Sequence, residues 1–90
     1  MMEKPKIIIC DDEEGVRESL RLILDMDFEP ILTGDGEEAI EKLKEQNDIK
    51  AVLLDIKMPK SDGLAVLKQI KELRPDMPVI MITGYQTTGT

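Results

Sequence analysis

Short runs of apolar residues alternate with longer stretches in which apolar residues recur every three or four positions. The runs predict buried β-strands at four places, residues 7–10, around 30–33, 51–54 and 79–83. In the stretches between these strands, the recurrence of apolar residues every three or four positions predicts three amphipathic helices. The apolar positions of these helices are Val16, Leu20, Ile23 and Leu24; Ala39, Ile40 and Leu43; and Leu64, Leu67, Ile70 and Leu73. The order β-α-β-α-β-α-β predicts a parallel sheet with right-handed crossovers and helices on both faces.

Polar residues, glycine and proline mark some of the element boundaries. Asp35 stands three residues before Glu38, a spacing typical of a capping box at the start of a helix. Gly63 permits a close backbone approach at the start of the third helix, which is predicted to end before Pro75. Residues 86–90 are polar, and we expect them to form a tail outside a domain core of about residues 6–85.

Composition limits the possible classes of protein. The chain has 90 residues, of which 41% are hydrophobic, and it lacks Trp, so we expect one small domain with an aliphatic core. A net charge of −7 argues against direct nucleic-acid binding, which needs clustered Lys and Arg. The single cysteine excludes an internal disulfide and favours a reducing cytoplasm. No apolar run is long enough to predict a membrane span.

Three of the predicted strands end at polar side chains, namely Asp11 and Asp12 after the first, Asp55 after the third and Thr83 after the fourth. In open α/β sheets, binding sites form beyond the carboxyl ends of the strands. If the first and third strands are neighbours, three carboxylates meet in one crevice and raise each other's pKa values. A hard divalent cation such as Mg²⁺ relieves this repulsion. The sequence therefore predicts a magnesium site.

Each of these side chains also has an ordinary structural interpretation. Asp11 or Asp12 could equally cap the first helix, a preferred use of aspartate. Asp55 could begin a turn by bonding its own backbone. Thr83 alone would be an unremarkable strand residue. Their shared position at one edge of the sheet favours a site.

Three segments resemble the receiver domain of bacterial two-component response regulators. They are IIICDDE (7–13), LLDIKMPKSDG (53–63) and VIMITGY (79–85), and the acidic pair precedes Asp55 by about 43 residues. The resemblance implies a flavodoxin-like α/β fold with strand order 2-1-3-4. It also implies that Asp55 accepts a phosphoryl group from a sensor histidine kinase, as a signalling switch rather than an enzyme.

The resemblance further implies a role for each residue of the site. Asp12, Asp55 and the backbone carbonyl of Lys57 would bind Mg²⁺, with Asp11 assisting through a water molecule. Thr83 would bond the phosphoryl oxygen and couple it to a conformational switch.

Receivers of this family continue with a fourth helix, a fifth strand that ends in a lysine, and a fifth helix. Residues 1–90 lack this fifth βα unit, so we interpret them as a single truncated receiver domain whose phosphotransfer is impaired. An uncovered sheet face and an exposed edge strand at residues 79–83 favour a homodimer or a domain-swapped assembly.

The sequence leaves three alternative functions to compare with this one. The chain could be a self-associating receiver fragment, or an engineered half-domain, without phosphotransfer activity. A phosphatase of the haloacid dehalogenase type needs a D-x-D pattern after the first strand, but here Asp11 and Asp12 are adjacent and Glu13 follows. A dinucleotide-binding half-domain would need glycines at that place.

Overall fold

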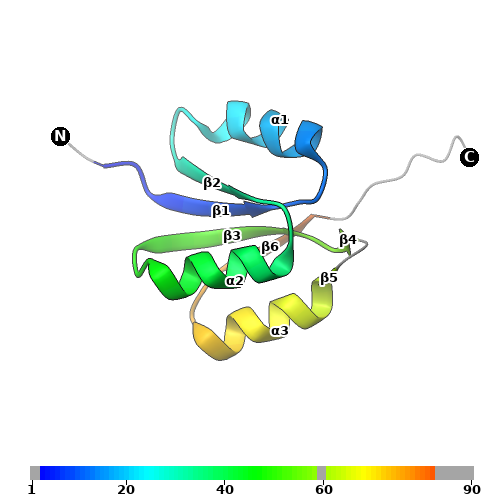
Figure 1. Ribbon diagram of the computed structural model, residues 1–90. Coiled ribbons are helices and arrows are strands. Elements are labelled where there is room, and N and C mark those ends of the chain that lie inside the picture. Colours follow the sequence, from blue (N-terminus) through cyan, green and yellow to red (C-terminus); the bar gives the residue numbers. More distant parts are fainter. Residues whose placement is uncertain (1–2, 59–60, 83–90) are drawn as a thin grey trace, which may run out of the picture.

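The computed structural model describes residues 3–58 and 61–82. Four parallel strands form the main sheet: β1 (Lys6–Cys10), β2 (Glu29–Thr33), β3 (Ile49–Asp55) and β6 (Val79–Ile82). Their order is β2-β1-β3-β6, the 2-1-3-4 order predicted from the sequence. Helix α1 (Glu14–Leu24) lies on one face, and α2 (Gly36–Glu45) and α3 (Gly63–Leu73) lie on the other (Figure 1). The fold is therefore a flavodoxin-like α/β sheet.

A short hairpin follows β3, where the sequence predicted only a turn. Its strands are β4 (Lys57–Met58) and β5 (Ser61–Asp62), which pair antiparallel. Asp62 then caps α3, because its Oδ1 accepts a hydrogen bond from the Leu64 N–H at 3.0 Å. The hairpin thus folds the chain back directly beyond Asp55 and leads it into the next helix.

The cap of α2 agrees only in part with the predicted capping box. Asp35 Oδ1 accepts the Glu38 N–H at 2.9 Å, as expected of an N-cap. The Glu38 carboxylate, however, accepts the N–H of Gly34 at 2.8 Å, one residue before the position that closes a capping box. The helix still begins where the pattern places it.

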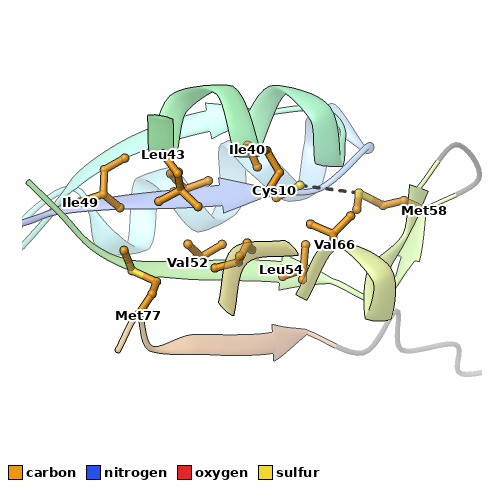
Figure 2. Packing of buried hydrophobic residues seen from close by; sticks show 12 residues of the cluster. Cys10, Ile40, Leu43, Ile49, Val52, Leu54, Met58, Val66 and Met77 are labelled. Carbon is orange, nitrogen blue, oxygen red and sulfur yellow. Dashed lines mark hydrogen bonds between the residues drawn. The ribbon is translucent and has the colours of Figure 1, made fainter. Parts of the chain in front are cut away.

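The hydrophobic core lies between the sheet and the pair α2 and α3 (Figure 2). Its buried members are Ile8, Cys10, Ala39, Ile40, Leu43, Ile49, Val52, Leu54, Met58, Val66, Ile70 and Met77. None of them is aromatic, in agreement with the aliphatic core expected from the composition. The predicted inward positions of α2 are all buried.

The predicted inward face of α3 is wrong at both of its ends. Leu64 is 63% exposed and Leu73 is 40% exposed, whereas Val66 and Ile70 are buried. At 3.6 residues per turn, nine residues make two and a half turns, so Leu64 and Leu73 point to opposite sides of the helix. The buried face is instead centred on Val66 and Ile70.

The face of the sheet that carries α1 is less completely covered. No residue of α1 is fully buried, and the predicted inward residue Ile23 is 69% exposed. On β6, Ile80 is 55% exposed. Within the described residues, no helix has both the length and the apolar character needed to cross a bilayer.

Candidate functional site

Three carboxylates meet at the carboxyl edge of the sheet. Asp55 is the last residue of β3, and Asp11 and Asp12 directly follow the neighbouring strand β1, whose Cys10 is in register with Leu54. One carboxylate oxygen from each of Asp11, Asp12 and Asp55 lies within 4.8 Å of the others. The adjacency of β1 and β3 thus brings together the three carboxylates, as the sequence predicted.

Asp11 is the most constrained of the three. Its side chain is buried, and its Oδ1 accepts the Glu13 N–H at 2.9 Å. Burial raises the pKa of Asp11, and the charges of Asp55 and Asp12 act in the same direction, whereas the Glu13 N–H opposes them. Glu13, not an aspartate, occupies the N-cap position of α1, and its side chain makes no cap bond. The alternative in which Asp11 or Asp12 caps this helix is therefore wrong.

Asp55 is buried at the end of β3, and its Oδ1 accepts the Lys57 N–H at 3.0 Å. This is the turn-forming bond that is the ordinary structural interpretation of Asp55, and it occurs together with the carboxylate cluster. The bond ties the main chain of Lys57 to the Asp55 carboxylate. Thr83, for which a contact with the phosphoryl group was predicted, lies outside the described residues.

One contact below the site was not predicted from the sequence. Cys10 Sγ lies 3.9 Å from Met58 Sδ, which packs the hairpin after β3 against the end of β1 (Figure 2). Burial raises the pKa of the Cys10 thiol to about 11. Met58 is an apolar residue in a segment that also contains Lys57, Lys60 and Ser61, and this apolar character was the available signal for the packing.

The start of α3 packs directly against the end of β3. A Cβ on Gly63 would lie 2.7 Å from Ile56 Cα and 3.1 Å from the Asp55 carbonyl oxygen. Only glycine fits this approach, as its place in the sequence indicated. The backbone that carries Asp55 is therefore set partly by a helix that begins eight residues later.

The chemistry of the cluster favours a cation. In the described part of the chain, none of the three carboxylates forms an ion pair with Lys or Arg. Carboxylate oxygens are hard ligands of the kind that Mg²⁺ prefers. Asp11, Asp12 and Asp55 therefore fit a magnesium ion both by donor type and by mutual distance.

Relatives share both the sequence pattern and the fold. The model of the response regulator receiver domain family matches residues 7–90. The hydrogenase transcriptional regulatory protein HoxA of Bradyrhizobium diazoefficiens is 40% identical over 79 residues, which make up 88% of this chain and 16% of HoxA. The chain thus spans less than one fifth of that relative's length.

Solved structures agree with this relationship. The CheY-like response regulator receiver domain protein of Methanospirillum hungatei JF-1 superimposes with a TM-score of 0.85 at 30% identity, covering 97% of this chain and 70% of that one. TrrA of Thermotoga maritima in complex with Mg(2+)-BeF superimposes with a TM-score of 0.84 at 35% identity, and the match covers 93% of this chain and 72% of that one. The structure of TrrA in complex with the histidine kinase ThkA gives a TM-score of 0.83 at 34% identity, and the match covers 98% of this chain and 75% of that one.

The family model covers all but the first six residues, and the strand order and the clustered aspartates agree with it. The chain belongs to the response regulator receiver domain family, the signalling domains of two-component systems.

Proposed function

We propose that residues 6–85 form the core of one receiver domain and that Asp55 is its phosphoacceptor. The observation that carries this proposal is the convergence of Asp11, Asp12 and Asp55 within 4.8 Å at the carboxyl edge of the sheet. The similarity to TrrA, which has been solved with a histidine kinase, supports a sensor histidine kinase as the donor.

The same three carboxylates are proposed to hold Mg²⁺, together with the backbone carbonyl of Lys57. Asp12 and Asp55 would bind the ion directly, and Asp11 would act through a water molecule. The complex of TrrA with Mg(2+)-BeF supports this choice of metal. When bound, the ion would neutralise charge on the carboxylates and on an incoming phosphoryl group.

Asp55 acts as the nucleophile in this proposal. Its Oδ1 is held by the Lys57 N–H, which orients the carboxylate so that the other oxygen can attack phosphorus. A P–O bond forms to Asp55 while the P–N bond of the kinase phosphohistidine breaks, and the electron pair leaves on the imidazole nitrogen. Thr83 is proposed to bond a phosphoryl oxygen of the product. The resulting acyl phosphate is a signal, so the domain acts as a switch rather than as an enzyme.

The test is intact-mass analysis after incubation with acetyl phosphate and Mg²⁺. The unmodified chain should gain one phosphoryl group, located on Asp55 by fragmentation, and Asp55→Asn should gain none. Asp27→Asn is the matched control, because Asp27 is an exposed aspartate outside the cluster. NMR shifts with Mg²⁺ and beryllofluoride, which coordinates a carboxylate oxygen, provide a second measurement that requires no phosphoryl transfer. Equal labelling of Asp55→Asn, or a wild type that shows neither label nor shift, would contradict the proposal and favour a self-associating module without phosphotransfer.

We also propose that a second copy of this chain pairs with β6 to form a homodimer. Among the described residues, no strand pairs with the outer edge of β6, whose Ile80 is 55% exposed. The opposite edge strand, β2, contains Pro30, which has no N–H to donate and so protects that edge. Strand β6 has no such protection, and a two-fold axis would join two identical edges.

A further inference from the structure

Arg17 lies over the loop that carries two of the three clustered aspartates. Its Nη1 donates a hydrogen bond of 2.8 Å to the Asp11 carbonyl oxygen. A Cβ on Gly34 would lie 3.5 Å from the same nitrogen, so the guanidinium group also lies against the loop between β2 and α2. Arg17 makes no ion pair with a described carboxylate. Its contacts are directed at main chain rather than at an opposite charge.

The loop of residues 11–13 has few other anchors. The Asp11 N–H donates to the Thr33 carbonyl at 3.1 Å, and the Glu13 N–H donates to the carboxylate of Asp11 itself. Within residues 3–58 and 61–82, Arg17 supplies the only side-chain bond to this loop's main chain from outside the loop. Removing it would free the Asp11 carbonyl and the peptide that leads to Asp12.

From these contacts we propose that Arg17 is a positioning residue, which holds the Asp11–Asp12 loop in the conformation that binds the divalent cation. The inference rests on the proposed function, because it concerns the same metal site. Positioning and charge act in opposite directions here. A positive side chain beside the cluster repels an incoming cation, whereas the bond to the Asp11 carbonyl organises its ligands.

The direction of the change in metal affinity therefore separates the two effects. Arg17→Ala should raise the dissociation constant for Mg²⁺, followed by NMR titration, by about five- to tenfold, the loss expected for one hydrogen bond. Arg17→Gln, which keeps a donor but removes the charge, should lie between Arg17→Ala and the wild type. A charge effect alone would make both variants bind Mg²⁺ more tightly.

Arg21→Ala is the matched control, because it removes the same charge one turn further along α1. Arg21 bonds Glu18 and does not contact the loop, so the Mg²⁺ affinity should stay unchanged. A midpoint of urea unfolding for Arg17→Gln close to that of Arg21→Ala would show that the fold is intact.

A measurement without metal keeps this inference separate from the proposed function. In the metal-free protein, Arg17→Ala should speed hydrogen exchange of the Glu13 amide, which is bonded to Asp11 Oδ1. A wild type that binds no Mg²⁺ would refute the proposed metal site. Unchanged hydrogen exchange of the Glu13 amide in Arg17→Ala would refute the role of Arg17 in holding the loop. Equal or tighter Mg²⁺ binding by Arg17→Ala would overturn the inference directly.

Discussion

Asp55 combines two uses of a carboxylate that the sequence presented as alternatives. It forms a local turn with the Lys57 N–H, and it also lies with Asp11 and Asp12 in one cluster. The two uses are compatible because the turn occupies one oxygen of the carboxylate. The turn fixes the orientation of the side chain, so an apparently structural bond contributes to the site.

Gly63 allows a direct test of how tightly the end of β3 is held. We expect Gly63→Ala to lower the free energy of unfolding by roughly 1–3 kcal/mol, because the new methyl group would overlap the Ile56 backbone and overpack the junction. Urea unfolding followed by far-UV circular dichroism measures this change. A shift of the Asp55 amide resonance in the folded variant would show that the displacement reaches the site.

The control for this prediction is the same substitution at Gly15. A Cβ there meets no atom within 4 Å, and Gly15 lies inside α1. Gly15→Ala should therefore raise the free energy of unfolding by about 0.4–1 kcal/mol, since alanine restricts the unfolded chain. Effects of the same sign at both glycines would contradict the steric explanation.

In helix α3 the hydrophobic pattern predicts the element but not which of its faces is buried. The pattern predicted the helix and its end before Pro75 correctly, but it placed Leu64 and Leu73 inside. Several apolar residues lie on more than one side of this helix, so the sequence allows two faces. The choice between them depends on packing against α2 and the sheet, which is not encoded in the spacing within α3 alone.

This assignment predicts unequal costs for two similar truncations. Ile70→Ala should lower the free energy of unfolding by about 2–5 kcal/mol, because Ile70 is fully buried and its removal leaves a cavity. Leu64→Ala should change it by less than about 0.5 kcal/mol, since Leu64 is largely exposed. Urea midpoints for the two variants give the comparison. Similar losses of unfolding free energy in the two variants would instead support the buried face predicted from the sequence.

The sheet and the carboxylate cluster were predictable for a common reason. Parallel strands end at the same edge, so adjacency of β1 and β3 is enough to bring Asp11, Asp12 and Asp55 together. The contacts of Cys10 with Met58 and of Arg17 with Asp11 were not predictable in this way. They depend on the path of a hairpin and on the direction of a long side chain.

The two faces of the whole sheet are unequally covered. Helices α2 and α3 close one face over the main core, whereas α1 is the only described helix on the other (Figure 1). Strand β6 forms one edge of the sheet, and its Ile80 is exposed. Among the described residues no strand pairs with the outer edge of β6. Apolar surface beside such an edge favours association, because pairing satisfies backbone groups and removes apolar area from water. A second copy offers the same edge, which is the basis of the proposed homodimer.

Ile80→Lys should therefore weaken self-association. The charge would be placed at the proposed two-fold contact, where each copy would bring a lysine close to its partner's and both would lose water. Leu22→Lys is the control, because Leu22 is 66% exposed on α1, away from β6, and should leave the assembly unchanged. Light scattering coupled to size exclusion over a dilution series measures the mass of each variant. We expect the wild type and Leu22→Lys to be dimers under conditions in which Ile80→Lys is monomeric. A wild type that remains a folded monomer at all concentrations would show that the β6 edge does not pair.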